Sequence, residues 1–185
     1  MKNLNELAHK IHESNKLRGF DVAQDNIGQS LMLIVGEIGE AMDAHQCGRF
    51  AKAEYENINA DMEDGVFSFA FGLFIKNTFE DELADIVIRT LDFCAAFGVD
   101  IEQAYRKTCI SYYDNIGEML LYCTDAITTY KKSSTIYGTM QCVYIARPIH
   151  VVEKIAKFHD INLEKHIALK MRYNETRPYK HGKRY

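Results

Sequence analysis

The 185-residue chain contains only two prolines, Pro148 and Pro178, and no tryptophan. Because proline interrupts a helix, its scarcity leaves long stretches in which helices can form without a break. Apolar residues recur in these stretches at the i, i+3, i+4 spacing of a helix, and no convincing alternation of apolar and polar residues indicates a strand. The sequence therefore predicts an all-α protein.

Long apolar runs are missing as well. A membrane-spanning helix needs about 20 apolar residues, and the longest run here, residues 66–75, has about half that length and fits a buried segment better. Residues 1–10 are polar and charged, without the apolar stretch of a secretory signal. We expect a cytoplasmic protein that has no membrane partner.

Neither sign of charge is in large excess. Twenty-two basic and 26 acidic residues give a net charge of −4, which provides no broad attraction to a nucleic-acid polymer. The cysteines are odd in number, widely spaced and without a pair at zinc-ligand spacing, so we expect reduced thiols in the core. They are Cys47, Cys94, Cys109, Cys123 and Cys142.

The length and the ordinary composition predict one domain that spans residues 1–185. Helix start and stop signals divide it into several helices. The expected helices cover residues 5–16, 26–45, 78–97, 100–132 and 139–159, and a last one runs from 162 to about 171. Residues 49–77 are the hardest to assign: residues 52–62 are polar and helical in character, and the apolar run follows.

Three local signals support these boundaries. Thr78 followed by Asp81 resembles a capping box, and Asn162 has the character of a helix cap. Pro148 should kink the helix over residues 139–159 or begin a new one. Residues 114–117 repeat the Asp-Asn-Ile-Gly of residues 25–28, which indicates either a degenerate internal duplication or a coincidence of capping chemistry.

Two acidic residues stand out in the helix over residues 26–45. Glu37 and Glu40 are three residues apart, so their side chains lie about 60° apart around the axis, one turn along it, and can share a ligand. Their neighbours, among them Ile34 and Ile38, make this helix apolar on nearly all sides, as is typical of a buried helix.

Glu82 and Asp85 repeat the arrangement in the next apolar helix, where Arg89 and Asp92 continue the stripe. If the two helices face each other, four carboxylates meet in a small volume and a divalent cation would relieve their repulsion. Oxygen ligands alone suit Mg²⁺, with Mn²⁺ as a substitute, and both commonly take further ligands from phosphates. The alternative is that each pair lies on a solvated helix stripe.

Residues 31–44, residues 79–89 and the tail over residues 163–183 together resemble the MazG-like family of all-α nucleoside triphosphate pyrophosphohydrolases, whose pattern is E-x-x-E followed by E-x-x-D. The resemblance implies a helical bundle of that type, usually a dimer or higher homo-oligomer. It also implies Mg²⁺-dependent conversion of a nucleoside triphosphate into monophosphate and pyrophosphate, by attack at the α-phosphorus, in nucleotide pool cleaning.

The resemblance also assigns residues. The family's metal ligands match Glu37, Glu40, Glu82 and Asp85, and tail positions associated with phosphate or nucleotide contact match Lys170, Asn174, Arg177 and Lys183. One of the acids would act as general base, and we favour Glu37. The tail also supplies further cations for a triphosphate, and an aromatic residue would line the base pocket. These are Arg172, Lys180, His181 and Arg184, and the aromatic candidates include Phe20 and Tyr173.

Two other interpretations stay open. A di-iron bundle also uses helix-borne acids, but typically with Glu-x-x-His pairs, which neither acidic pair here provides. A non-catalytic MazG-like nucleotide-binding or interaction module is the second, and an exposed position for residues 66–75 would favour it.

Overall fold

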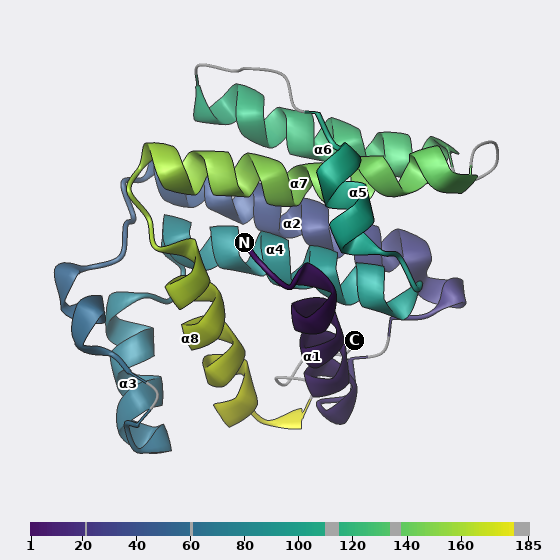
Figure 1. Ribbon diagram of the computed structural model, residues 1–185. Coiled ribbons are helices and arrows are strands. Elements are labelled where there is room, and N and C mark those ends of the chain that lie inside the picture. Colours follow the sequence, from purple (N-terminus) through teal and green to yellow (C-terminus); the bar gives the residue numbers. More distant parts are fainter. Residues whose placement is uncertain (21, 60, 110–114, 134–137, 180–185) are drawn as a thin grey trace.

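A computed structural model describes residues 1–20, 22–59, 61–109, 115–133 and 138–179 (Figure 1). These residues form eight α-helices, two short 3₁₀ helices and no strand, which confirms the all-α prediction. The α-helices are α1 (Leu4–Leu17), α2 (Ile27–Gln46), α3 (Asp64–Phe74), α4 (Phe79–Ala96), α5 (Ile101–Lys107), α6 (Ile116–Ser133), α7 (Gly138–Phe158) and α8 (Leu163–Thr176). The 3₁₀ helices are η1 (Gln24–Asn26) and η2 (Ala53–Asn57).

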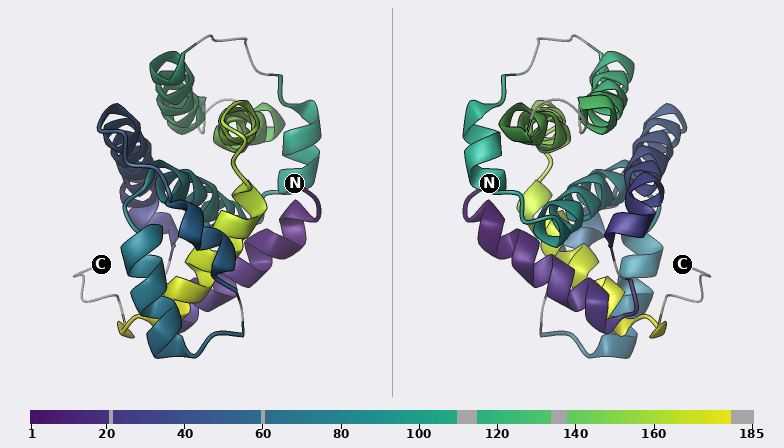
Figure 2. Two further views of the ribbon diagram at one scale, coloured as in Figure 1. Left: turned by 90° about the vertical axis from the view of Figure 1, so that its left-hand side faces the viewer. Right: turned by 90° about the vertical axis from the view of Figure 1, so that its right-hand side faces the viewer.

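Helix α4 is the centre of the arrangement and packs against α1, α2, α7 and α8. Helices α6 and α7 lie on one side of it, while α1, α8 and α3 lie on the other (Figure 2). The sequence of α4 explains this place, because its buried residues include Leu83, Ile86, Val87 and Leu91 around most of its circumference. A helix that is apolar on nearly every side has to be covered on every side.

Helix α4 begins with the expected cap. The Thr78 hydroxyl accepts a hydrogen bond from the Asp81 amide at 3.4 Å. In a capping box the Asp81 carboxylate would bond to the Thr78 amide, but here it accepts from the Asn77 amide at 3.0 Å. Asn162 caps α8 as predicted, accepting from the Lys165 amide.

Replacing Thr78 with alanine should lower the free energy of unfolding by about 1 kcal/mol, because the Asp81 amide then loses its side-chain acceptor at a buried helix start. Urea unfolding followed by circular dichroism measures the change. Thr78→Ser keeps the acceptor and should lose much less, and equal losses in the two variants would contradict this role of the hydroxyl.

The single helix predicted over residues 100–132 is wrong. Helix α5 ends at Lys107, and α6 begins only at Ile116. Thr108 is already extended, and its hydroxyl donates to the backbone oxygens of Ala104 and of Val143 in α7. This tertiary hydrogen bond ties the end of α5 to α7, and no local sequence signal marks it.

At Pro148 no new helix begins, and α7 continues through it. On one face of α7 the side chains near the proline are fully buried, with Ile145, Ile149 and Val152 all at 0 % exposure. Packing of this face against the core offsets the backbone hydrogen bond that proline removes.

The apolar run over residues 66–75 was predicted to be buried. The prediction is correct for only one face of the helix that this run forms. In α3, Phe67 and Phe71 are buried toward α8 and η2, but Val66, Phe69 and Leu73 are 52 %, 72 % and 48 % exposed. The reason is that α3, at the side of the molecule, makes its main contacts in the described part of the chain with these two elements (Figure 1). Within the polar stretch before it, helical structure is limited to η2 among the described residues.

The core-thiol prediction is correct for Cys94 and Cys123, which are buried, and wrong for Cys47 and Cys109, which are exposed. None of the five cysteines forms a disulfide within the described part of the chain. None of the helices in the described part of the chain combines the length and apolar character that a membrane crossing requires.

The proposed repeat stays a prediction. Both stretches precede helices that pack together, α2 and α6. Their asparagines differ in role, however, since Asn115 accepts from the Glu118 amide inside its helix whereas Asn26 accepts from the preceding Ala23 amide.

Candidate metal centre and nucleotide cavity

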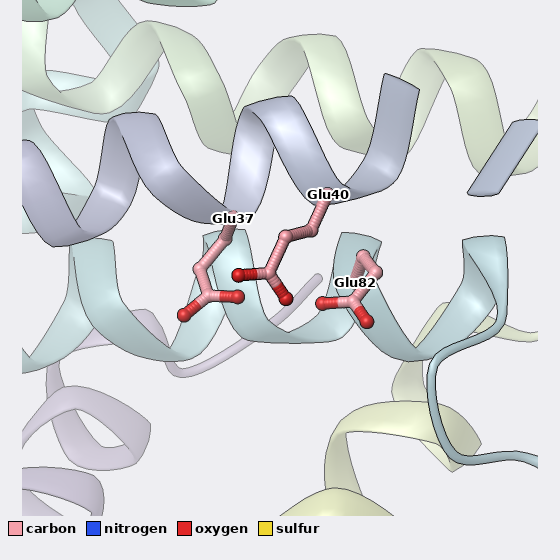
Figure 3. A group of neighbouring side chains, drawn as sticks. All are labelled: Glu37, Glu40 and Glu82. Carbon is pink, nitrogen blue, oxygen red and sulfur yellow. The ribbon is translucent and has the colours of Figure 1, made fainter. Parts of the chain in front are cut away.

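Three of the four predicted metal ligands meet between α2 and α4. Glu37 and Glu40 point from α2 toward α4, where Glu82 points back at them (Figure 3). One carboxylate oxygen from each lies within 4.8 Å of the others. Oxygens at this spacing could share one cation.

The burial of these acids favours the binding of a cation, because buried carboxylates repel one another strongly. Glu37 and Glu82 are only 7 % and 4 % exposed, whereas Glu40 is exposed and opens the group to solvent. Their helices bring the acids into the interior because the flanking residues, such as Ile38 and Leu83, belong to the core. The centre is therefore walled by apolar residues and accessible from the side of Glu40.

Asp85, the fourth predicted ligand, lies outside this group. Its Oδ2 is 2.7 Å from the Lys170 Nζ, which is also 2.8 Å from Asp81 Oδ1. Lys170 reaches these carboxylates from α8 and is 6 % exposed. Asp81 was predicted only as part of a capping box and not as a partner of Lys170, although its position one turn before Asp85 places both on the same helix face.

Arg89 and Asp92, which continue the acidic stripe, also have fixed partners. The Arg89 Nε donates to Glu37 Oε1 at 2.5 Å. The Asp92 carboxylate contacts the His12 Nδ1 at 2.7 Å and accepts from the Asn15 amide group at 2.7 Å. Arg89 therefore neutralises one acid of the centre, and Asp92 holds α1 against α4.

A cavity of about 390 Å³ contains the metal centre. Lys170, Asn174 and Arg177, which the sequence assigned to the substrate, all line it, while Lys183 lies outside the described residues. The Asn174 Oδ1 is buried and has no hydrogen-bond partner among the described residues. A donor group of a ligand would satisfy it.

Lys76 lines the same cavity and was missed by sequence analysis. It lies in the turn between α3 and α4, before Asn77, whose φ of 61° reverses the chain there. Arg172, by contrast, was assigned to the substrate tail but donates to the backbone oxygens of Asn59 and Met62. This correction follows from the continuation of α8 to Thr176, which turns Arg172 away from the cavity.

Aromatic side chains complete the cavity wall. Phe20 and Tyr173 both line it, as expected of residues near a base, and Tyr173 stacks on Phe71 with ring centroids 4.3 Å apart. Gly19 is needed at the end of α1, because its φ is 83° and an added Cβ would meet the Tyr179 ring at 2.2 Å. The segment after α8 thus runs close against α1, beside the cavity.

Burial changes the pKa of Glu37, Asp81 and Glu82. Burial, followed by the charges of Asp81 and Asp85, raises the pKa of Glu82 from 4.5 to about 9. Burial also raises the pKa of Asp81 to about 6, and burial and Asp85 raise that of Glu37 against the opposing effect of Arg89. A buried, oxygen-only set of acids fits Mg²⁺, whose binding would release the proton that Glu82 otherwise holds at neutral pH.

The raised pKa of Glu82 has a consequence for stability. Between about pH 5 and pH 9 the folded, metal-free chain binds a proton that the unfolded chain has lost, so its stability should fall as the pH rises. Glu82→Gln stays neutral and should flatten this decline. Thermal unfolding in the presence of a chelator, between about pH 5 and pH 9, measures this dependence of stability on pH. Glu13→Gln, at an exposed site on α1, is the control. If stability falls with pH as steeply in Glu82→Gln as in the wild type, the raised pKa of Glu82 is contradicted.

Comparison of the chain with protein-family models, with curated proteins and with solved structures found no match.

Proposed function

We propose that this protein is a Mg²⁺-dependent nucleoside triphosphate pyrophosphohydrolase that produces a monophosphate and pyrophosphate in nucleotide pool cleaning. The observation that carries the proposal is the meeting of Glu37, Glu40 and Glu82 in one cavity with residues suited to a nucleotide. The resemblance to the MazG-like family assigns the reaction, and the cavity is consistent with it.

The ligand chemistry favours Mg²⁺ over iron. The three acids offer only oxygen, and no histidine is among the described residues that line the cavity. Hard cations prefer such a site, whereas di-iron bundles pair their acids with histidines. When bound, the cation would neutralise phosphate oxygens and activate a water.

The cations of the cavity divide into two groups. Arg89 and Lys170 are committed to carboxylates. Lys76 and Arg177 line the same cavity, and neither has an acidic ion-pair partner among the described residues. A triphosphate carries charge that such unpaired cations can neutralise, so we assign its phosphates to these two residues.

Other residues of the cavity suit a nucleoside. Phe20 and Tyr173 bring aromatic rings to its wall, and the unpaired Asn174 oxygen can accept from a base or sugar. Glu37 remains our candidate for the general base that prepares water for attack at the α-phosphorus. Its contact with Arg89 holds the carboxylate in a fixed orientation.

The test is incubation with Mg²⁺ and a panel of canonical and modified nucleoside triphosphates, with monophosphate, diphosphate and pyrophosphate resolved. Monophosphate with pyrophosphate, absent from Glu40→Gln, supports the proposal and names the base. Release of diphosphate with orthophosphate would contradict the proposed reaction and indicate a different hydrolase. A folded chain without turnover would exclude an enzyme acting on this panel.

Lys76→Met should raise KM for the triphosphate on the order of tenfold, because a charge-assisted contact with phosphate is lost. Arg177→Met should act in the same direction. Steady-state kinetics measures both, with Lys157→Met, an exposed lysine on α7, as control. An unchanged KM in both cavity variants would contradict the assignment of the phosphates.

A second candidate is a non-catalytic nucleotide-binding or interaction module. The exposed apolar stripe of Val66, Phe69 and Leu73 on α3 favours it, because such surfaces often mark protein contacts. Nucleotide and Mg²⁺ binding without turnover would favour this function. The expected homo-oligomer can be tested by sedimentation, and Phe69→Asp would weaken it if the stripe forms the contact.

A further inference from the structure

We propose that Lys170 is a built-in cation of the acidic centre, so that the chain binds one divalent cation, on Glu37, Glu40 and Glu82, while Asp85 stays paired with Lys170. This inference rests on the proposed metal centre and concerns its stoichiometry and ligands. It assigns Lys170 a positioning role in place of the substrate contact expected from the sequence.

The first support is the geometry of the lysine. Its Nζ lies 2.8 Å from Asp81 Oδ1 and 2.7 Å from Asp85 Oδ2, two acids one turn apart on α4. A single ammonium thus bridges two carboxylates, as a divalent cation would. Asp85 is accordingly absent from the group of oxygens within 4.8 Å of one another.

The second support is that the bridge is anchored. Asp81 is 1 % exposed, and its other oxygen accepts from the Asn77 amide at the start of α4. The Lys170 ammonium lies 5.9 Å from the centre of the Phe71 ring, which Tyr173 covers. Moving Lys170 toward a substrate would leave Asp81 as a buried, unpaired charge, which is strongly unfavourable.

The third support is the contrast with the other acids. Among the described residues neither Glu40 nor Glu82 forms an ion pair, and Glu40 is exposed. Glu37 has Arg89 on one oxygen and can use its other oxygen for a metal. The resident cations therefore neutralise one side of the centre and leave one divalent site.

The experiment is a titration of the 185-residue chain with Mn²⁺, without nucleotide, in which electron paramagnetic resonance measures the concentration of the free ion. Asp85→Asn and Glu40→Gln form a matched pair, since each removes one negative charge and little volume. We expect one Mn²⁺ per wild-type chain, weakening of more than about 100-fold in Glu40→Gln, and weakening below about tenfold in Asp85→Asn.

Lys170→Met provides the converse test. It frees Asp85 and Asp81, so a second Mn²⁺ should bind to this variant. Two ions on the wild-type chain, or equal weakening in Asp85→Asn and Glu40→Gln, would overturn the inference. Circular dichroism will show whether Lys170→Met folds. If it does not, the comparison of Asp85→Asn with Glu40→Gln still tests the inference.

The outcome is separable from that of the proposed function. If the chain binds one Mn²⁺ with the expected variant pattern but does not turn over nucleotides, the hydrolase proposal is wrong and the role of Lys170 as a built-in cation stands. If the chain turns over nucleotides and binds two ions, the hydrolase proposal stands and the built-in cation is wrong.

Discussion

Glu40→Gln is expected to lower Mg²⁺-dependent turnover of a nucleoside triphosphate by about 10³-fold. A bound metal contributes several kcal/mol of transition-state stabilisation, and each 1.4 kcal/mol or so corresponds to a factor of about ten in rate. Glu40 contributes one of three oxygens to the proposed site, and its amide replacement is a poor ligand for a hard cation. Single-turnover measurements at saturating Mg²⁺ would show the loss.

The fold should survive this substitution, because Glu40 is exposed and glutamine has nearly the same shape. Glu13→Gln, at an exposed position of α1 outside the cavity, removes the same charge and should retain full activity. Turnover of Glu40→Gln within about tenfold of the wild type would show that the reaction does not depend on a metal held by this acid.

Lys170→Met is expected to destabilise the chain by about 3–5 kcal/mol near neutral pH, because it leaves two carboxylates of α4 without their buried cation. The substitution also removes the ion pairs that join α8 to α4. Although burial alone would lower it, the pKa of Lys170 is raised by Asp85 and Asp81, so the lysine is charged across the working range of pH. Urea unfolding in a chelator measures the difference.

Lys165→Met is the matched control on the same helix. Lys165 pairs with the exposed carboxylate of Glu56 at 2.9 Å, and such a surface pair contributes no more than about 1 kcal/mol. A similar small loss of unfolding free energy in both variants would mean that the ion pairs of Lys170 do not hold α8 to α4. A large loss of unfolding free energy in Lys170→Met that added Mn²⁺ reverses would agree with a cation bridge at Asp85.

The helices and their ends follow largely from local sequence. Periodic apolar residues and the scarcity of proline predict the all-α fold, and the hydroxyl of Thr78 and the amide of Asn162 mark two helix starts that the structure confirms. The spacing of Glu37 and Glu40 on one apolar helix likewise requires only the pitch of the helix. These features depend on residues within a few positions of one another.

Tertiary structure alone decides which of these residues meet. No local pattern shows that Lys170 reaches back to Asp81 and Asp85, or that Thr108 ends α5 by bonding to α7. The half-exposed position of α3 is of the same kind, since its apolar sequence is covered only where α8 and η2 pack against it. Helical period places a side chain on a face of its own helix, whereas partners between helices depend on packing angles that only the assembled core determines.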